Sequence, residues 1–449
     1  MSMDPRTRAA RHAFIIILCI GTAVSAWAQD QWSRFRGPGG RGLAAVENPN
    51  LPESWSATRN VAWKTSIPGL GWSSPIVWDD TIFVTTVTSD GKVETPQGGL
   101  YRNGERAVPN DVHHWKILAI DFDTGTVRWE REVFSGVPDF AHHLKNTFAS
   151  HTPVTDGERV YVYFGNVGTF TYDMDGNPQW STEIPWTDSR NGWGAAASPV
   201  LHNGRLYLVN DNDEQSYVMA LSAETGAKIW QTDRDEGSNW SSPFVWENSA
   251  RTELVTTGTD KVRSYDLDGN LLWELSGMST ITIPTPFADG DLLYIASGYV
   301  GDQFRPVYAI RPGGLGDISL TDEQTTNEFI AWHLTQGGPY NPSPILYGGY
   351  YYTLYDRGLL TAHDAKTGTE IYGRQRIAVG EAFTASPWAY NGKIFALSEE
   401  GTTYAIEAGS EFKVVGKNPL DEFSMATPAI VGSSLVIRTA RHLYRIVNQ

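Results

Sequence analysis

The chain has 449 residues, 41% of them hydrophobic and 12% aromatic, and its formal net charge is −16 at pH 7. So acidic a surface repels phosphate backbones, which argues against nucleic acid as a partner. The single cysteine, Cys19, lies in an apolar N-terminal stretch, so the chain beyond it has no disulfide and no thiolate metal site.

The first 28 residues are expected to be a cleaved signal peptide. Three arginines within residues 6–11 precede an apolar stretch at 13–24, and Ala26 and Ala28 have the spacing that signal peptidase requires. A lipoprotein signal requires a small residue before its cysteine, but Leu18 precedes Cys19, so lipidation is not expected. No later stretch approaches the roughly 18 apolar residues of a membrane span. We therefore expect a periplasmic or secreted protein with no transmembrane segment in the mature chain.

Residues 29–59 are expected to form an N-terminal arm. This segment contains Trp32, Phe35 and two arginines, followed by Gly37-Pro38, a dipeptide that interrupts regular secondary structure. We expect the arm to lie on the rest of the molecule as a strap held by Trp32 and Phe35. An arm that binds a partner is the alternative.

The remainder of the chain repeats one unit eight times. Each unit opens with Ser or Thr followed by Pro, at Pro75, Pro153, Pro199, Pro243, Pro286, Pro344, Pro387 and Pro428. The steps between these prolines are 78, 46, 44, 43, 58, 43 and 41 residues. A period in the forties with short strands is typical of β-propeller blades, so the two long steps indicate insertions.

Most units also contain a segment of the form Asp-x-x-Thr-Gly-x-x-x-Trp. The clearest copies lie at 121–129, 222–230 and 364–372, and the last of these ends in Tyr. Asp caps its own backbone and Gly accepts a positive φ, so the segment makes a tight turn between two strands. The apolar runs between opening and turn, such as 160–164, do not alternate with polar residues, which indicates strands buried on both faces.

These patterns predict an all-β chain whose residues 60–449 form a single eight-bladed β-propeller with four-stranded antiparallel blades. The last unit has only three strands, near Ala429, Leu435 and Leu443. Residues 60–64, Asn-Val-Ala-Trp-Lys, have the pattern of a closing strand with no unit before it. We therefore predict that this N-terminal strand completes the eighth blade, because closing the ring removes exposed sheet edges.

The segment from Ala119 to Trp129 resembles the tryptophan-docking repeat of the pyrroloquinoline quinone (PQQ) propeller superfamily. That superfamily includes periplasmic quinoprotein alcohol dehydrogenases and the propeller lipoprotein of the bacterial outer-membrane assembly machine. The segments 32–38 and 311–318 resemble a largely uncharacterised secreted branch of PQQ-like repeat proteins. The resemblance implies the fold, but a fold does not carry a functional site with it.

The dehydrogenases of the superfamily hold the quinone between a Trp and a vicinal disulfide, with a calcium ion bound by Glu, Asn and Asp and with an Asp base. This sequence has no cysteine pair and no Cys-x-x-Cys-His haem motif, and no counterpart of the calcium ligands is clear. We therefore expect that no cofactor is required. A quinoprotein-like oxidoreductase that uses pyrroloquinoline quinone and calcium is the alternative.

In a propeller, the segments that lead into the innermost strands meet on one face beside the axis. The loops between second and third strands share that face, and function concentrates on such loops. We expect a funnel for a planar or carbohydrate ligand there, with the candidate residues Trp72, His143, Lys145, Asn146, Trp193, Trp240 and Tyr340. The alternative is that the large side chains only plug the channel.

Two candidates, Lys145 and Asn146, lie side by side in the second entry loop. A lysine beside the axis of an acidic protein offers a positive charge to an anionic ligand, and Asn adds a neutral donor and acceptor. The alternative is a solvated lysine next to an Asn that caps the turn.

Five of the ten histidines are expected in one neighbourhood, because the first insertion and the second entry loop lie next to each other. Imidazole is a good ligand for zinc or copper, and the candidate metal ligands are His113, His114, His142 and His143. Adjacent side chains of an extended backbone point apart, however. Histidines that hydrogen-bond to loop backbone are therefore the alternative.

The sequence favours a non-catalytic platform that binds a protein partner, an extracellular small molecule or a glycan. No motif requires catalysis. The quinoprotein is the second hypothesis, and a histidine-bound metal that acts on a glycan or phenolic substrate is the third.

Overall fold

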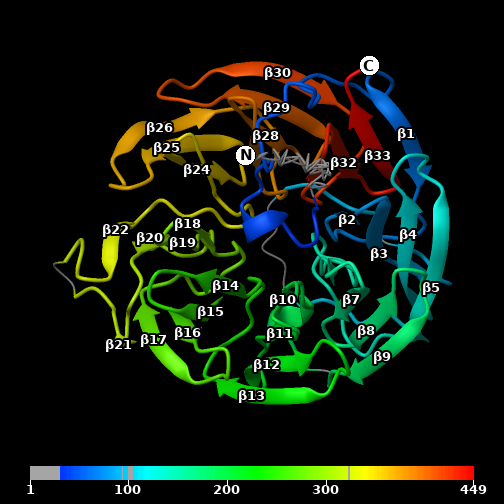
Figure 1. Ribbon diagram of the computed structural model, residues 1–449, viewed down its shortest axis with the longest axis horizontal. Coiled ribbons are helices and arrows are strands. Elements are labelled where there is room, and N and C mark those ends of the chain that lie inside the picture. The colour runs from blue at the N-terminus through cyan, green and yellow to red at the C-terminus, as the bar shows by residue number, and fades with distance from the viewer. Residues whose placement is uncertain (1–30, 94, 100–104, 186, 322–323) are drawn as a thin grey trace, which may run out of the picture.

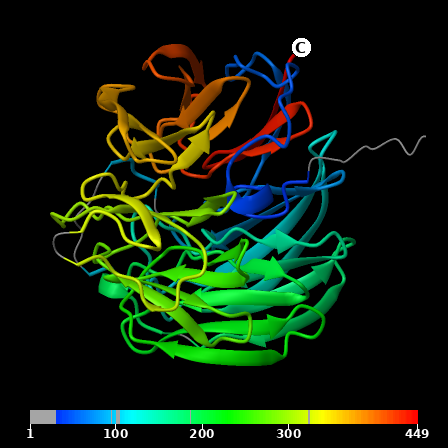
Figure 2. The same cartoon turned by 60° about the vertical axis from the view of Figure 1, so that its left-hand side comes forward.

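The computed structural model describes residues 31–93, 95–99, 105–185, 187–321 and 324–449. These residues form eight β-sheets arranged as blades around a hub, which Figure 1 shows along the axis and Figure 2 shows obliquely. Within the described chain, seven sheets have four strands and one has five. The predicted all-β, eight-bladed propeller is thus confirmed. The predicted signal peptide, residues 1–28, lies outside the described residues.

Each blade begins with a strand at the hub and ends with a strand at the rim. Blades one to four consist of β2 (Ile76–Trp78), β3 (Thr81–Ser89), β4 (His113–Asp121) and β5 (Val127–Gly136); β6 (Val154–Thr155), β7 (Arg159–Phe164), β8 (Gly168–Asp173) and β9 (Pro178–Glu183); β10 (Val200–His202), β11 (Arg205–Asn210), β12 (Ser216–Ser222) and β13 (Lys228–Arg234); and β14 (Phe244–Glu247), β15 (Thr252–Thr257), β16 (Lys261–Tyr265) and β17 (Leu271–Ser276). Blades five to eight consist of β18 (Phe287–Asp289), β19 (Leu292–Ala296), β20 (Val307–Ile310) and β22 (Ile330–Leu334); β23 (Ile345–Tyr347), β24 (Tyr350–Tyr355), β25 (Leu359–Asp364) and β26 (Glu370–Arg376); β27 (Trp388–Tyr390), β28 (Lys393–Leu397), β29 (Thr402–Glu407) and β30 (Val414–Pro419); and β31 (Ala429–Val431), β32 (Ser434–Arg438), β33 (His442–Val447) and β1 (Val61–Ser66). Every hub strand starts directly after a proline of the repeat.

The N-terminal strand β1 closes the ring. It pairs antiparallel with β33 at the rim of blade eight, where Lys64 lies opposite Tyr444. The indole Nε1 of Trp63 in β1 also donates to the carbonyl of Phe122 in blade one, at 2.9 Å. The prediction that residues near 60–64 complete the eighth blade is confirmed, and the outer edge of β33 is covered.

In the described chain, the repeated tryptophan fastens five of the eight blades to the next one. Its Nε1 donates at 2.9 Å to a carbonyl in the following blade's turn, from Trp63 to Phe122, Trp129 to Met174, Trp180 to Ala223, Trp230 to Leu267 and Trp332 to Ala365. The glycine of the turn lies against the indole: at Gly226, whose φ is +73°, an added Cβ would stand 2.4 Å from the ring of Trp180. The repeat therefore needs glycine both for its backbone conformation and for space.

The insertion in blade five adds a fifth strand to blade four. This strand, β21 (Gly316–Asp317), pairs parallel with β17, and Gly316 lies opposite Trp273. Trp273 donates its Nε1 to Glu253 of its own blade at 2.6 Å. Blade four thus carries one strand more than predicted, because the residues that follow β20 run back along the rim of the preceding blade.

Residues 31–60 lie against the ends of the hub strands that point away from the Ser/Thr-Pro steps. Trp32 pairs with Val77 through both backbone groups at 2.9 Å, and the carbonyl of Gly42 accepts from the N–H of Ala389 at 3.1 Å. Trp32 and Trp55 are buried in the apolar core shared by blades one, seven and eight. Figure 1 shows this segment, in blue, crossing the hub.

The described residues also form two short 3₁₀ helices, η1 (Pro38–Gly40) and η2 (Arg190–Gly192). Neither these nor any other part of the described chain supplies a helix long and apolar enough to cross a membrane.

Candidate functional site

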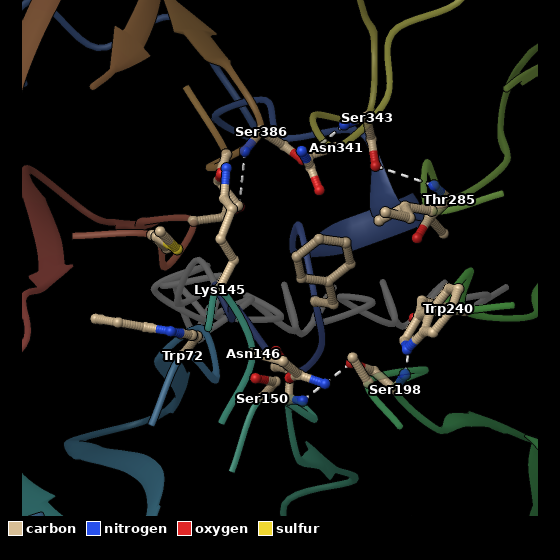
Figure 3. A pocket seen from close by; sticks show the side chains of 18 of the residues that line it. Trp72, Lys145, Asn146, Ser150, Ser198, Trp240, Thr285, Asn341, Ser343 and Ser386 are labelled. Carbon is tan, nitrogen blue, oxygen red and sulfur yellow. Dashed lines mark hydrogen bonds between the residues drawn. The ribbon is translucent and has the colours of Figure 1, made fainter. Parts of the chain in front are cut away.

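A cavity of about 190 Å³ lies at the hub, on the face where the innermost strands begin (Figure 3). All eight blades contribute to its wall through the segments that precede the hub strands, and Phe35 of the arm contributes as well. The lining contains every predicted funnel residue: Trp72, His143, Lys145, Asn146, Trp193, Trp240 and Tyr340. The structure brings these seven side chains together, and their role in binding stays a prediction.

A ring of hydroxyl groups surrounds this cavity. At six of the eight junctions in the described chain, the Ser or Thr before the proline uses its backbone N–H to donate to the hydroxyl of the next blade's Ser or Thr. These bonds, of 2.8–3.0 Å, run from Ser74 to Thr152, Thr152 to Ser198, Ser198 to Ser242, Thr285 to Ser343, Ser343 to Ser386 and Ser386 to Thr427. Figure 3 shows the link between Thr285 and Ser343.

The hydroxyl ring explains why each repeat unit opens with Ser or Thr before its proline. A hydroxyl is needed because it accepts the neighbouring N–H, and proline has no N–H of its own to satisfy. The described residues lack this bond at two junctions, between blades four and five and between blades eight and one. At the second of these, Arg438 donates to the hydroxyl of Ser73 at 2.6 Å. The signal was present in the sequence as the recurrence of a hydroxyl at one position in all eight units.

The aromatic part of the wall carries unpaired hydrogen-bond donors. The indoles of Trp193 and Trp240 lie 5.9 Å apart between ring centroids, and Trp240 donates its Nε1 to the carbonyl of Gly194 at 2.6 Å. Trp72 and Trp193 are only 7% and 6% exposed, yet their Nε1 atoms have no partner among the described residues. Buried donors are nearly always satisfied by protein or by ordered water, so each of these two leaves a place for an acceptor outside the described residues.

His143 adds a third donor to this wall. Burial, and then the nearby charge of Lys145, lower the pKa of its imidazole to about 4. The ring is therefore neutral at pH 7. Its Nδ1 accepts from the backbone N–H of Lys145 at 3.1 Å, so the proton resides on Nε2.

Lys145 does not present the free positive charge that we expected from the sequence. Its ammonium forms an ion pair with Glu399 at 2.6 Å, and the two side chains are 9% and 0% exposed. Glu399 also accepts from the hydroxyl of Thr384 and from the backbone N–H of Gly99, both at 2.6 Å. The sequence does not indicate this pair, because Glu399 lies 254 positions further along the chain and ring closure alone brings it to the second entry loop. A role of Lys145 in binding stays a prediction.

Asn146 holds the loop rather than facing a ligand with free groups. Its amide nitrogen donates to the carbonyls of Trp193 and Ala195 at 2.9 and 3.1 Å, and its oxygen accepts from the N–H of Thr147 at 2.8 Å. These bonds fix the second and third entry loops against each other, which differs from the turn-capping Asn of our alternative.

The candidate metal ligands have partners of their own. His113 and His142 use Nδ1 on the backbone carbonyls of Asp111 and His143, at 2.8 and 2.9 Å. His114 lies between two carboxylates near the surface. In the described ranges, no group of three or more His, Cys, Asp or Glu side chains is placed to hold a metal ion. Two of the four candidates thus bond to backbone carbonyls, and His113 and His114 lie in strand β4 rather than in a loop.

His151, beside the cavity wall, makes the stability depend on pH. It is 3% exposed, its ring nitrogens have no partner in the described chain, and burial lowers its pKa to about 3. Below pH 6.5, His151 is protonated in the unfolded chain but stays neutral in the native state. The free energy of unfolding is therefore unaffected by His151 above pH 6.5. It falls by ~1.4 kcal/mol per pH unit as the pH drops from 6.5 towards 3.

This prediction is tested by urea unfolding at pH 7 and pH 4, in wild type and in His151→Leu. We expect the variant to lose less stability than wild type between these pH values. Equal losses in the two proteins would contradict the assignment to His151.

The repeat, the closed ring and the axial cavity define a PQQ-like β-propeller. A family model described as outer membrane protein assembly factor BamB matches residues 25–213, 171–313 and 214–447, and the chain belongs to this family. It is 23% identical over 261 residues to the outer membrane protein assembly factor BamB of Moranella endobia (strain PCIT). That match spans 53% of this chain and 62% of the relative, less than two thirds of its length.

Solved structures of two kinds resemble the fold. BamB from Moraxella catarrhalis has a TM-score of 0.56 at 9% identity and covers 85% of this chain and 98% of its own. A europium-containing methanol dehydrogenase has a TM-score of 0.59 at 10% identity, with 92% and 90% covered. At these identities the likeness shows the fold alone.

Proposed function

We propose that this protein is a non-catalytic binding platform of the periplasm or the cell exterior. Its funnel face takes up an uncharged, acceptor-rich group, which is either a small molecule or part of a protein partner. The family supports a protein partner, since its members are named as assembly factors.

The observation that carries this proposal is the set of unpaired donors in the cavity wall. Nε1 of Trp72 and Nε1 of Trp193 have no partner among the described residues, and they line the same cavity as His143. Carbonyl or hydroxyl oxygens of a ligand would accept from these donors, while the aromatic faces pack against its body. The charge of Lys145 is neutralised by Glu399, which favours a neutral ligand over an anionic one.

A calcium-bound quinone is supported less well. Calcium takes six to eight oxygen ligands, usually with carboxylates among them. The lining of the axial cavity, so far as the chain is described, includes no Asp or Glu side chain. We therefore keep quinone binding only as an outcome of the test.

The test titrates the purified protein with an end-blocked tetraglycine peptide and with a neutral glucose tetrasaccharide in a calorimeter. We expect one probe to bind and Trp193→Phe to weaken that binding about 3- to 10-fold, because one hydrogen bond is worth roughly 1 kcal/mol. Trp180→Phe is the matched control, since the Nε1 of Trp180 is already paired with Ala223 at the rim and its loss should leave affinity unchanged.

The proposal is wrong if neither probe binds, or if Trp193→Phe binds as wild type does. Stoichiometric uptake of pyrroloquinoline quinone with calcium would replace it by the oxidoreductase hypothesis.

A further inference from the structure

A second cavity, of about 390 Å³, lies between the arm and the far ends of the hub strands of blades three, four and five. It is on the face opposite the funnel, because its lining includes His202 and Glu247, the last residues of β10 and β14. The arm contributes Arg34 and Arg41. We call this cavity the arm-face pocket.

Arg34 is the cation without a counter-ion in this pocket. No hydrogen bond or ion pair joins its guanidinium to any described residue, and its Nη2 lies beside Gly40, where an added Cβ would be 3.6 Å away. Burial lowers the pKa of Arg34 to about 10, and no carboxylate offsets the effect. The group nevertheless stays charged at pH 7, and it keeps five N–H donors to offer. Arg34 is half-buried, so its charge is partly desolvated, and such a charge is costly unless it is paired.

The carboxylates near the pocket lie beside side chains other than Arg34. Asp289 forms an ion pair with Arg41 at 2.8 Å. Glu247, with a side chain 71% exposed, lies 3.9 Å from Nδ1 of His202. Arg34 therefore remains unmatched even though the protein as a whole is strongly acidic.

The pocket also has an apolar and aromatic wall. Phe244 is 4% exposed and Trp246 is 1% exposed, and both line the pocket. Nε1 of Trp246 is a buried donor with no partner in the described chain. The charged donor of Arg34 thus lies beside an aromatic wall against which a flat hydrocarbon group can pack.

We propose that the arm-face pocket binds a small organic anion. A carboxylate or phosphate group pairs with Arg34, and an apolar or aromatic body packs against Phe244 and Trp246. Arginine presents a planar fork that matches both kinds of anion. This site is separate from the funnel and does not rest on its proposed function.

The test uses benzoate, phenyl phosphate and inorganic phosphate as probes, each titrated into the purified protein and followed by ligand-observed NMR. We expect one or both aromatic anions to bind, and more tightly than inorganic phosphate. Arg34→Gln should weaken binding about 10- to 100-fold, as expected for a charge-assisted hydrogen bond. Comparison of benzoate with phenyl phosphate tells a carboxylate site from a phosphate site.

Arg205→Gln is the matched control: it removes the same charge on the same face, but Arg205 already pairs with Asp268 at 2.9 Å, so affinity should be kept. Glu247→Gln is a second variant that does not threaten folding, because it lies at the surface; it should tighten binding about 2- to 5-fold by removing a repelling charge. The proposal is overturned if neither aromatic probe binds at a concentration of roughly 10 mM, which is about the weakest affinity of practical use. Unchanged affinity in both Arg34→Gln and Glu247→Gln overturns it too.

Discussion

A chain that lacks residues 1–64 is expected to lose its cooperative unfolding transition. The deletion removes most of β1, so β33 is left with an unpaired edge and blade one loses the indole of Trp63. It also removes Trp32 and Trp55 from the core shared by blades one, seven and eight. The free energy of unfolding of a domain is only about 5–15 kcal/mol. The stabilisation lost with the strand and with three buried or half-buried tryptophans exceeds that margin.

Thermal unfolding followed by circular dichroism measures this effect, with a chain that starts at residue 29 as the reference. A synthetic peptide of residues 29–66 is the control, because its addition should restore the transition if loss of the arm and of β1 is the cause. A truncated chain that melts like the reference would contradict closure by β1.

The substitution Gly226→Ala is expected to destabilise the protein by about 3–5 kcal/mol. Part of this is the cost of a side chain at φ +73°, of order 1–2 kcal/mol. The rest arises because the new Cβ would stand 2.4 Å from the ring of Trp180. The indole would have to leave the turn, and its hydrogen bond to Ala223 would be lost.

Gly204→Ala in the same blade separates the two contributions. Gly204 has a φ of +71°, and nothing in the described chain lies within 4 Å of an added Cβ. It should therefore cost only the conformational part. Urea midpoints of the two variants and wild type provide the comparison, and equal losses in the two variants would show that tryptophan docking adds nothing.

The architecture could be predicted because its signals are local and repeated. The Ser/Thr-Pro steps mark where each hub strand starts, and the Asp-x-x-Thr-Gly segments mark turns between outer strands. The motif at 60–64 revealed the closing strand, since it had the outer-strand pattern without the unit that should precede it. The funnel residues followed from the same periodicity, because equivalent positions of a ring meet at its hub.

Contacts that occur once could not be predicted in this way. The ion pair of Lys145 with Glu399 joins blades two and seven, and no repeat relates the two residues. The position of Arg34 depends on how the arm crosses the hub, and the arm has no periodicity. The parallel strand β21 belongs to an insertion whose sequence does not match the repeat pattern. Such features arise from tertiary packing, which a single sequence does not display.

The arm makes the propeller a cup rather than a tube. Phe35 lies in the wall of the axial cavity and the arm crosses the opposite end of the hub, so a ligand bound there as we propose would have to leave through the opening by which it entered. A partner bound over that opening would therefore block dissociation of the ligand until the partner itself dissociates.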